Sequence, residues 1–135
     1  MKKRILLADI TYLDEVTEFV ESELDQADCP MRTKLQIRLA VEEIFVNIAS
    51  YAYPGTKGEV ELLCELLPDP KKIRICFSDS GIPFNPLAKE DADTSEEALM
   101  GREGGLGILL VKKTMDKVEY ARVEGKNQLT IEKRL

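Results

Sequence analysis

The stretch LAVEEIFVNIASYAYPG, residues 39–55, contains neither glycine nor proline before Pro54 and therefore predicts most of one long helix. Pro30 suits the beginning of this helix, which we expect to run from residue 31 to residue 52. At about 100° per residue, six of its apolar side chains fall within about 50° of one direction. They are Ile37, Val41, Ile44, Phe45, Ile48 and Ala52. This stripe predicts the face of the helix that packs into a core.

Two polar side chains of the same helix, Glu43 and Asn47, are four residues apart and therefore lie on one side of it. They point roughly away from the apolar stripe, but Leu39, Ala40 and Val46 flank them. A helix that is apolar on most sides is buried, so these polar groups need a cavity above them. The pair therefore indicates a site. An ion pair of Glu43 with a nearby lysine or arginine, and local capping by Asn47, would explain it equally well.

Shorter elements are predicted on both sides of this helix. The expected strands are residues 5–7, 59–67, 72–77, 117–123 and 128–133, with a turn at 124–127, and the other expected helices are 12–27 and 106–115. The helices are segregated from antiparallel strand pairs, which predicts an α+β fold. We expect a two-layer α/β sandwich with a mixed, mostly antiparallel sheet and helices on one face, forming a single domain over residues 1–135.

The long connection between the strand pairs, residues 85–103, carries six acidic and two basic side chains. Irregular segments longer than about 12–15 residues in a compact domain are usually functional covers or disordered. We interpret this connection as a mobile lid.

Composition excludes several classes of function. The 135 residues include no histidine, which excludes Ser-His-Asp and Cys-His nucleophiles and Cys/His zinc sites. With 19 basic and 25 acidic side chains, the net charge of −6 argues against nucleic acid as a partner. Three cysteines argue against a disulfide framework, and no apolar stretch is long enough to span a membrane. We expect a cytoplasmic protein that binds neither nucleic acid nor membrane.

The segment DSGIPF, residues 79–84, follows the strand predicted to end at Phe77. A carboxylate at the end of a strand can accept a hydrogen bond from an amino group, and Gly81 lets a flat ligand approach the backbone. This chemistry makes Asp79 a candidate ligand-binding residue. The same residues in succession also make an ordinary turn.

The glycines Gly104, Gly105 and Gly107 lead into the helix predicted at residues 106–115. The start of a helix exposes unpaired N–H groups at the positive end of its dipole, which suits a phosphate. No GKS or GKT follows, so this is not a Walker A loop. A flexible hinge for the lid is the alternative interpretation.

Taken together and in this order, the three segments resemble the N, G1 and G2 boxes of the GHKL ATP-binding superfamily. Within it the chain looks most like the small anti-sigma-factor serine kinases of the RsbW and SpoIIAB type. The segments that carry the resemblance are LAVEEIFVNIASYAYPG, FSDSGIPFNPL, GGLGILLVKKTMDKVEY and the closing strand NQLTIEKR. The sequence departs from the family at Ser50, Tyr51 and Ala52, where a histidine and a glycine often follow the asparagine.

The resemblance implies a role for each candidate residue. Asn47 would ligate Mg²⁺, Asp79 would accept from the adenine amino group, and Glu43 would be the general base. Further nucleotide contacts are implied at Gly81, Phe84, Gly104, Gly105, Leu106, Gly107 and Thr130. Arg102 would reach the terminal phosphate or a partner protein, and a solvated side chain is the alternative interpretation.

The resemblance also implies a function. We expect an ATP- and Mg²⁺-dependent protein serine kinase that phosphorylates a small anti-sigma-factor antagonist protein and also binds a sigma factor. Kinases of this type commonly form dimers, so a homodimer is among the expected assemblies. The alternative is an ATP-gated binding module that sequesters a regulator without phosphoryl transfer. Glu43 favours the kinase, because binding alone does not need a carboxylate facing the phosphates.

Overall fold

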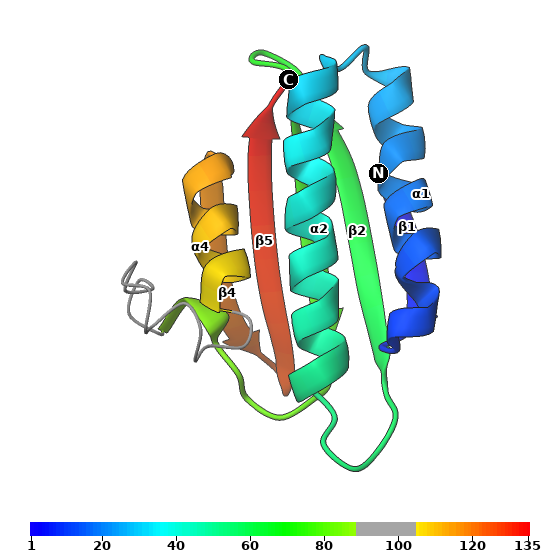
Figure 1. Ribbon diagram of the computed structural model, residues 1–135, viewed down its shortest axis with the longest axis vertical. Helices are drawn as coiled ribbons and strands as arrows, with labels where there is room; N and C mark the ends of the chain where they lie inside the picture. The colour runs from blue at the N-terminus through cyan, green and yellow to red at the C-terminus, as the bar shows by residue number, and fades with distance from the viewer. Residues whose placement is uncertain (89–104) are drawn as a thin grey trace.

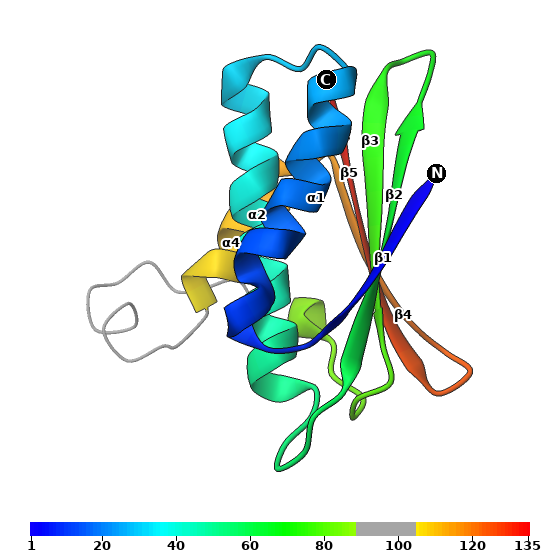
Figure 2. The same ribbon diagram turned by 90° about the vertical axis from the view of Figure 1, so that its right-hand side faces the viewer.

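The computed structural model describes residues 1–88 and 105–135, and these residues form two layers (Figure 1). One layer is a five-stranded sheet, and the other consists of three helices that all cover the same face of it, as Figure 2 shows. The predicted α+β sandwich with helices on one face is therefore confirmed. The sheet is antiparallel at every pairing instead of mixed.

The three helices are α1 (Leu13–Gln26), α2 (Met31–Tyr51) and α4 (Gly105–Thr114), each within one residue of its predicted bounds. Two short 3₁₀ turns, Ile10–Tyr12 and Pro86–Ala88, accompany them. Pro30 precedes α2 as expected, because a helix start does not need the N–H that proline lacks. Within the two described ranges, no helix is both long and apolar enough to cross a membrane.

The five strands are β1 (Lys2–Leu7), β2 (Glu59–Leu67), β3 (Lys72–Asp79), β4 (Lys117–Val123) and β5 (Lys126–Arg134), in the spatial order β1-β2-β3-β5-β4. The two predicted strand pairs, β2–β3 and β4–β5, are hairpins. The central pairing of β3 with β5 joins the two hairpins and places Asp79 opposite Asn127.

The turn predicted at residues 124–127 is shorter in the structure. Glu124 and Gly125 both have positive φ, 50° and 79°, which is the backbone of a two-residue hairpin turn. The ladder therefore extends to Lys126 and Asn127, two residues beyond the predicted strand. In the same way β3 continues past Phe77 to Asp79.

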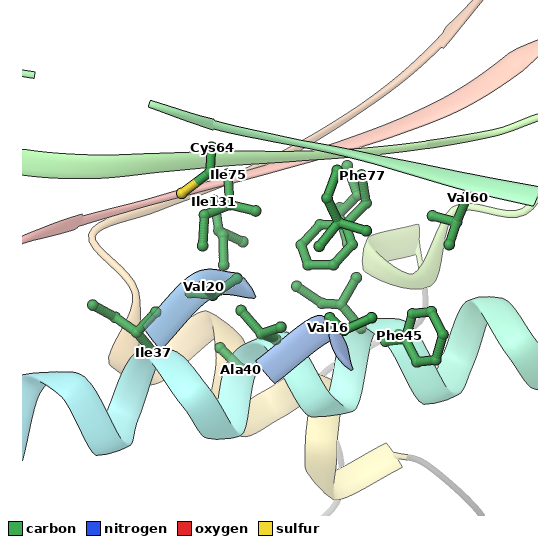
Figure 3. Close-up of a cluster of buried hydrophobic side chains, with 14 of the residues drawn as sticks. Val16, Val20, Ile37, Ala40, Phe45, Val60, Cys64, Ile75, Phe77 and Ile131 are labelled. Carbon is green, nitrogen blue, oxygen red and sulfur yellow. The ribbon is translucent and has the colours of Figure 1, made fainter. Parts of the chain in front are cut away.

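The core lies between the helices and the sheet (Figure 3). All six residues of the predicted α2 stripe are buried, at 9% exposure or less. Figure 3 shows Phe45 of α2, Val16 of α1 and Phe77 of β3 in this layer. Complete burial of a side chain of this size contributes about 1.5–3 kcal/mol. The stripe therefore fixes α2 on the sheet and determines which of its residues remain at the rim.

The opposite face of the sheet holds a buried carboxylate, Glu132 of β5, whose side chain is only 6% exposed. Its oxygens accept from Lys72 Nζ at 2.8 Å and Arg74 Nε at 3.0 Å, and Lys117 Nζ is 3.8 Å away. The hydrogen bond from Lys72 and the bond and charge of Arg74 lower the pKa of Glu132 despite its burial. The cluster therefore links the first residue of β3 to β5.

We predict that Glu132→Gln lowers the unfolding free energy by about 1 kcal/mol at pH 7, because charge-assisted bonds to half-exposed partners are lost. A lowered folded-state pKa contributes stability above the unfolded-chain value of about 4.3, and that contribution is lost as the pH falls through the folded value. Urea unfolding at neutral and acidic pH measures the unfolding free energies of the wild type and the variant. The difference between wild type and variant should vanish in acid.

The matched control is Glu119→Gln on β4, whose side chain is 63% exposed beside Lys117. Its unfolding free energy should change by less than about 0.5 kcal/mol. Equal effects of both substitutions, or a Glu132→Gln deficit that persists in acid, would contradict the role given to the cluster.

Candidate functional site

A pocket opens where the second half of α2 passes over the ends of β3 and β5. Its enclosed cavity volume is about 20 Å³, room for about one water molecule, and the open space at its mouth brings the total to about 390 Å³. Its polar lining residues are Asn47, Asp79, Tyr120 and Asn127, and the others are apolar. A concave apolar surface with a few convergent polar groups is typical of a ligand-binding site.

Asp79, the last residue of β3, is only 5% exposed and lines this pocket. Its Oδ1 accepts two hydrogen bonds, from Gly81 N at 2.9 Å and from Asn127 Nδ2 at 2.9 Å. Its Oδ2 makes no hydrogen bond within the described part of the chain. Because every fully buried side-chain oxygen and nitrogen there does have a partner, Oδ2 is not fully buried. It can therefore accept a hydrogen bond from a ligand.

Asn47 and Glu43 lie on the side of α2 that faces α4. Asn47 is 8% exposed, and its Nδ2 donates to Glu43 O at 3.0 Å. This bond turns the amide nitrogen along the helix and leaves the amide oxygen as the group available for a ligand. The alternative that Asn47 only bonds locally is thus correct in part, because the side chain does bond its own helix. Asn47 also lines the pocket, however.

Glu43 is half-buried, and burial followed by the nearby charge of Glu42 raises the pKa of its carboxyl group. Arg38 pairs with Glu42 and Glu21, and none of the ion pairs among residues 1–88 and 105–135 involves Glu43. The alternative of a structural ion pair for Glu43 therefore finds no support in the described structure.

The first turn of α4 lies directly against Glu43. A Cβ added to Gly107 would be 1.8 Å from Glu43 Oε2, so only glycine lets the carboxylate occupy this position. The neighbouring Ile108 lines the pocket, and Gly105 and Leu106 are the first two residues of the helix. The first N–H groups of a helix have no partner within it. The structure thus brings the start of α4, Glu43 and the pocket together.

Two of the predicted residues next to this turn, Arg102 and Gly104, lie outside the described residues. The same holds for most of the predicted lid, whose residues 89–103 are not described. Their roles stay predictions.

The structure requires glycine at position 81 for a different purpose than the one predicted from the sequence. A Cβ at this position would lie 2.2 Å from Ala52 O, and Ile82 N donates to the same oxygen at 2.9 Å. The missing side chain therefore lets residues 80–84 pack onto the end of α2. The interpretation that it makes room for a flat ligand is corrected, because backbone of α2 fills that space.

Phe84 lines the pocket and packs against Tyr51, with ring centroids 5.6 Å apart at an interplanar angle of 35°. Ala52 also lines the pocket. Of the three residues at which the sequence departs from the family it resembles, Ala52 thus lines the pocket and Tyr51 packs against a residue that lines it.

Thr130 does not line the pocket. Side chains alternate along a strand, and Leu129 and Ile131 are buried on the helix-covered face, so Thr130 lies on the other face opposite Cys76. Its predicted place in the site is therefore corrected. The residue of β5 that reaches the pocket is Asn127, which shares its face with Leu129 and donates to Asp79.

Sequence reasoning missed Asn127 and Tyr120. The available signal was the alternation from Ile131 through Leu129 to residue 127, which a turn predicted at residues 124–127 concealed. Tyr120 pairs with Leu129 across the β4–β5 hairpin and therefore also lies on the pocket face.

Among protein families, a model described as Histidine kinase-like ATPase domain matches residues 6–133. Serine-protein kinase RsbW of Listeria monocytogenes is 31% identical over 93 residues, which cover 66% of this chain and 59% of that protein. Serine-protein kinase RsbW of Staphylococcus aureus is 32% identical over 96 residues, covering 65% and 58%. The match thus spans less than two thirds of the length of these relatives.

A solved structure supports the architecture. The histidine kinase domain of a blue-light activated histidine kinase from Erythrobacter litoralis superposes with a TM-score of 0.60 over 93% of this chain and 60% of that chain, at 20% identity. At this level of identity the likeness shows the fold alone.

The contact between Gly107 and Glu43 predicts an energetic coupling. Gly107→Ala alone should change the unfolding free energy by less than about 0.5 kcal/mol, because displacing the carboxylate offsets the better helix propensity of alanine. In a Glu43→Ala background the same substitution should stabilise by up to about 1 kcal/mol. Chemical unfolding of the four proteins measures the coupling. An equal effect of Gly107→Ala in both backgrounds would show that the two residues do not touch.

Proposed function

The chain belongs to the histidine kinase-like ATPase domain family, and on this basis we propose that it binds ATP and transfers the terminal phosphoryl group to a serine of a small protein. The observation that carries the proposal is the contact of Glu43 with the first turn of α4, beside a pocket lined by Asp79 and Asn47. An acceptor for a base, a helix start and a carboxylate thus occur within one site.

The adenine end of the proposed site is the apolar pocket with Asp79. The accessible Asp79 Oδ2 is an acceptor suited to the amino group of adenine. Phe84, Ile48 and Leu129 supply apolar surface for the ring. A planar, mostly apolar base with one exocyclic donor fits this lining.

The phosphate end is the start of α4. The N–H groups of Gly105, Leu106 and Gly107 belong to the first turn, where the helix dipole favours an anion. We include Gly104 and Arg102 in this end of the site on the resemblance alone. The lid proposed for residues 85–103 would cover it.

Magnesium fits the donor set on α2. Asn47 offers one amide oxygen, and the described residues hold no cluster of three or more acidic, cysteine or histidine side chains that would form a protein cage. Mg²⁺ typically takes few protein oxygens and keeps water and phosphate ligands. Bound there, the ion would supply charge neutralisation at the phosphates, and Asn47 would hold it.

Glu43 is proposed as the general base. The serine hydroxyl oxygen attacks the terminal phosphorus, the bond from that phosphorus to the bridging oxygen breaks, ADP leaves, and Glu43 takes the hydroxyl proton. Burial raises the pKa of Glu43 and so brings its basicity closer to neutral pH. Most of the remaining acceleration would come from positioning and charge neutralisation.

The proposed protein substrate is an anti-sigma-factor antagonist, and a sigma factor is the proposed second partner. The support is the similarity to proteins named serine-protein kinase RsbW. The position of Glu43 favours phosphoryl transfer over an ATP-gated binding module, since a module has no use for a base at the phosphates.

We predict that Asp79→Asn weakens ATP binding by about tenfold or more, because an amide replaces the anionic acceptor of the amino group. Isothermal titration calorimetry measures the affinity, and circular dichroism checks the fold. Asp69→Asn, the same change in the turn at the other end of β3, is the control and should leave affinity unchanged. Unaltered ATP affinity of Asp79→Asn would contradict the adenine assignment.

Glu43→Gln should retain ATP binding but lower the rate of phosphoryl transfer by about 10²–10⁴-fold, because the proton acceptor is lost. The assay uses radiolabelled ATP, Mg²⁺ and a panel of small antagonist proteins encoded in the same genome. Glu42→Gln, at the adjacent residue paired with Arg38, is the control and should retain transfer.

Transfer by Glu43→Gln at the wild-type rate would contradict the general-base role. ATP binding by the wild type without transfer to any antagonist would favour the binding module instead.

A further inference from the structure

The amide of Asn127 uses all of its hydrogen-bonding capacity inside the protein. Its Nδ2 donates to Asp79 Oδ1 at 2.9 Å and to Ile82 O at 2.8 Å. Its Oδ1 accepts from Tyr120 OH at 2.5 Å and from Phe84 N at 3.2 Å. A primary amide has two donor hydrogens and one oxygen with two lone pairs, so all four positions are filled. Asn127 is 5% exposed and has nothing left to offer a ligand.

The partners also fix which way the amide points. A rotated amide would turn its N–H groups toward Phe84 N, which can only donate, and its oxygen toward the Asp79 carboxylate, which can only accept. Tyr120 OH reinforces the observed orientation by donating to the amide oxygen. A misoriented buried amide would leave several polar groups unsatisfied, each at a substantial cost in free energy. The donor side of Asn127 is therefore held toward Asp79.

This arrangement gives the two oxygens of Asp79 different hydrogen-bonding environments. Oδ1 is occupied by Asn127 and by Gly81 N, whereas Oδ2 has no partner in the described structure. A carboxylate held by two donors at one oxygen cannot rotate without losing both bonds. Arg122, opposite Asn127 on β4, adds a bond to Gly81 O at 2.9 Å and holds the same loop.

We propose that Asn127 is a positioning residue that fixes Asp79 Oδ1, so that Oδ2 is presented to the exocyclic amino group of the ligand base, and that Tyr120 fixes Asn127 in turn. The proposal rests on the proposed function, because it takes the base to be adenine. It makes selectivity for an amino-bearing purine depend on two residues that do not bind the base through their own polar groups. A merely structural role in holding residues 80–84 would instead affect every nucleotide alike.

The test is a thermodynamic cycle between residue 127 and the amino group of the base. Affinities of wild type and Asn127→Leu are measured for ATP and for purine riboside triphosphate, which lacks the 6-amino group. Leucine has a similar shape but forms no hydrogen bond. Wild type should prefer ATP by about tenfold or more, as expected for a bond to a charged group. Asn127→Leu should lose most of that preference, by weakening ATP binding and changing the affinity for the other nucleotide little.

Tyr120→Phe provides a milder second variant, because it keeps the ring in the pocket and removes only the hydroxyl that holds Asn127. It should reduce the preference for ATP in the same direction by a few fold. Tyr12→Phe is the control, because the Tyr12 hydroxyl makes no hydrogen bond in the described structure, and it should keep the wild-type ratio. If Asn127→Leu does not fold by circular dichroism, Tyr120→Phe decides the test.

The outcomes separate the two proposals. A wild type that binds ATP no better than the nucleotide without the amino group would overturn the adenine assignment and this inference with it. A wild-type preference that Asn127→Leu, or Tyr120→Phe in its place, retains in full would overturn the inference alone. An equal loss of affinity for both nucleotides would likewise overturn it, by showing a structural role.

Discussion

The packing of α2 on the sheet is the constraint on which the rest of the structure depends. One stripe of the helix, from Ile37 to Ala52, is buried in the core, and this fixes the rotation of the helix about its own axis. Once the rotation is fixed, Asn47 must lie over the ends of β3 and β5, and Glu43 must face α4. The polar residues of the site are thus positioned by apolar contacts on the other side of the same helix.

Two glycines allow neighbouring segments to approach α2 closely. Gly81 lets the loop after β3 contact the carbonyl of Ala52, and Gly107 lets the first turn of α4 contact the carboxylate of Glu43. The sequence predicts that Gly81 makes room for a flat ligand and that Gly107 belongs to a helix start that exposes N–H groups. In the structure, the missing side chain of each makes room for another part of the protein.

Much of the fold could be predicted from the sequence, because the periodicity of apolar residues determines helices and strands locally. The bounds of α2 and the pairing of both hairpins followed from that signal. The contribution of β5 to the site could not be predicted in the same way. A strand places alternate residues on opposite faces, and the end of the turn decides which residues belong to the strand. The positive φ of Glu124, which few non-glycine residues adopt, shortens the turn and extends the strand to Asn127. Thr130 is excluded from the site by the alternation that buries Leu129 and Ile131.

In the proposed complex, the base of an adenine nucleotide occupies the pocket and meets the Asp79 carboxylate, which Asn127 holds in position. The most direct measurement is a crystal structure of the protein with Mg²⁺ and a non-hydrolysable ATP analogue. We predict that the exocyclic amino nitrogen lies within hydrogen-bonding distance of Asp79 Oδ2 and that the phosphates lie at the first turn of α4. A nucleotide bound elsewhere, or one whose base faces away from Asp79, would contradict it.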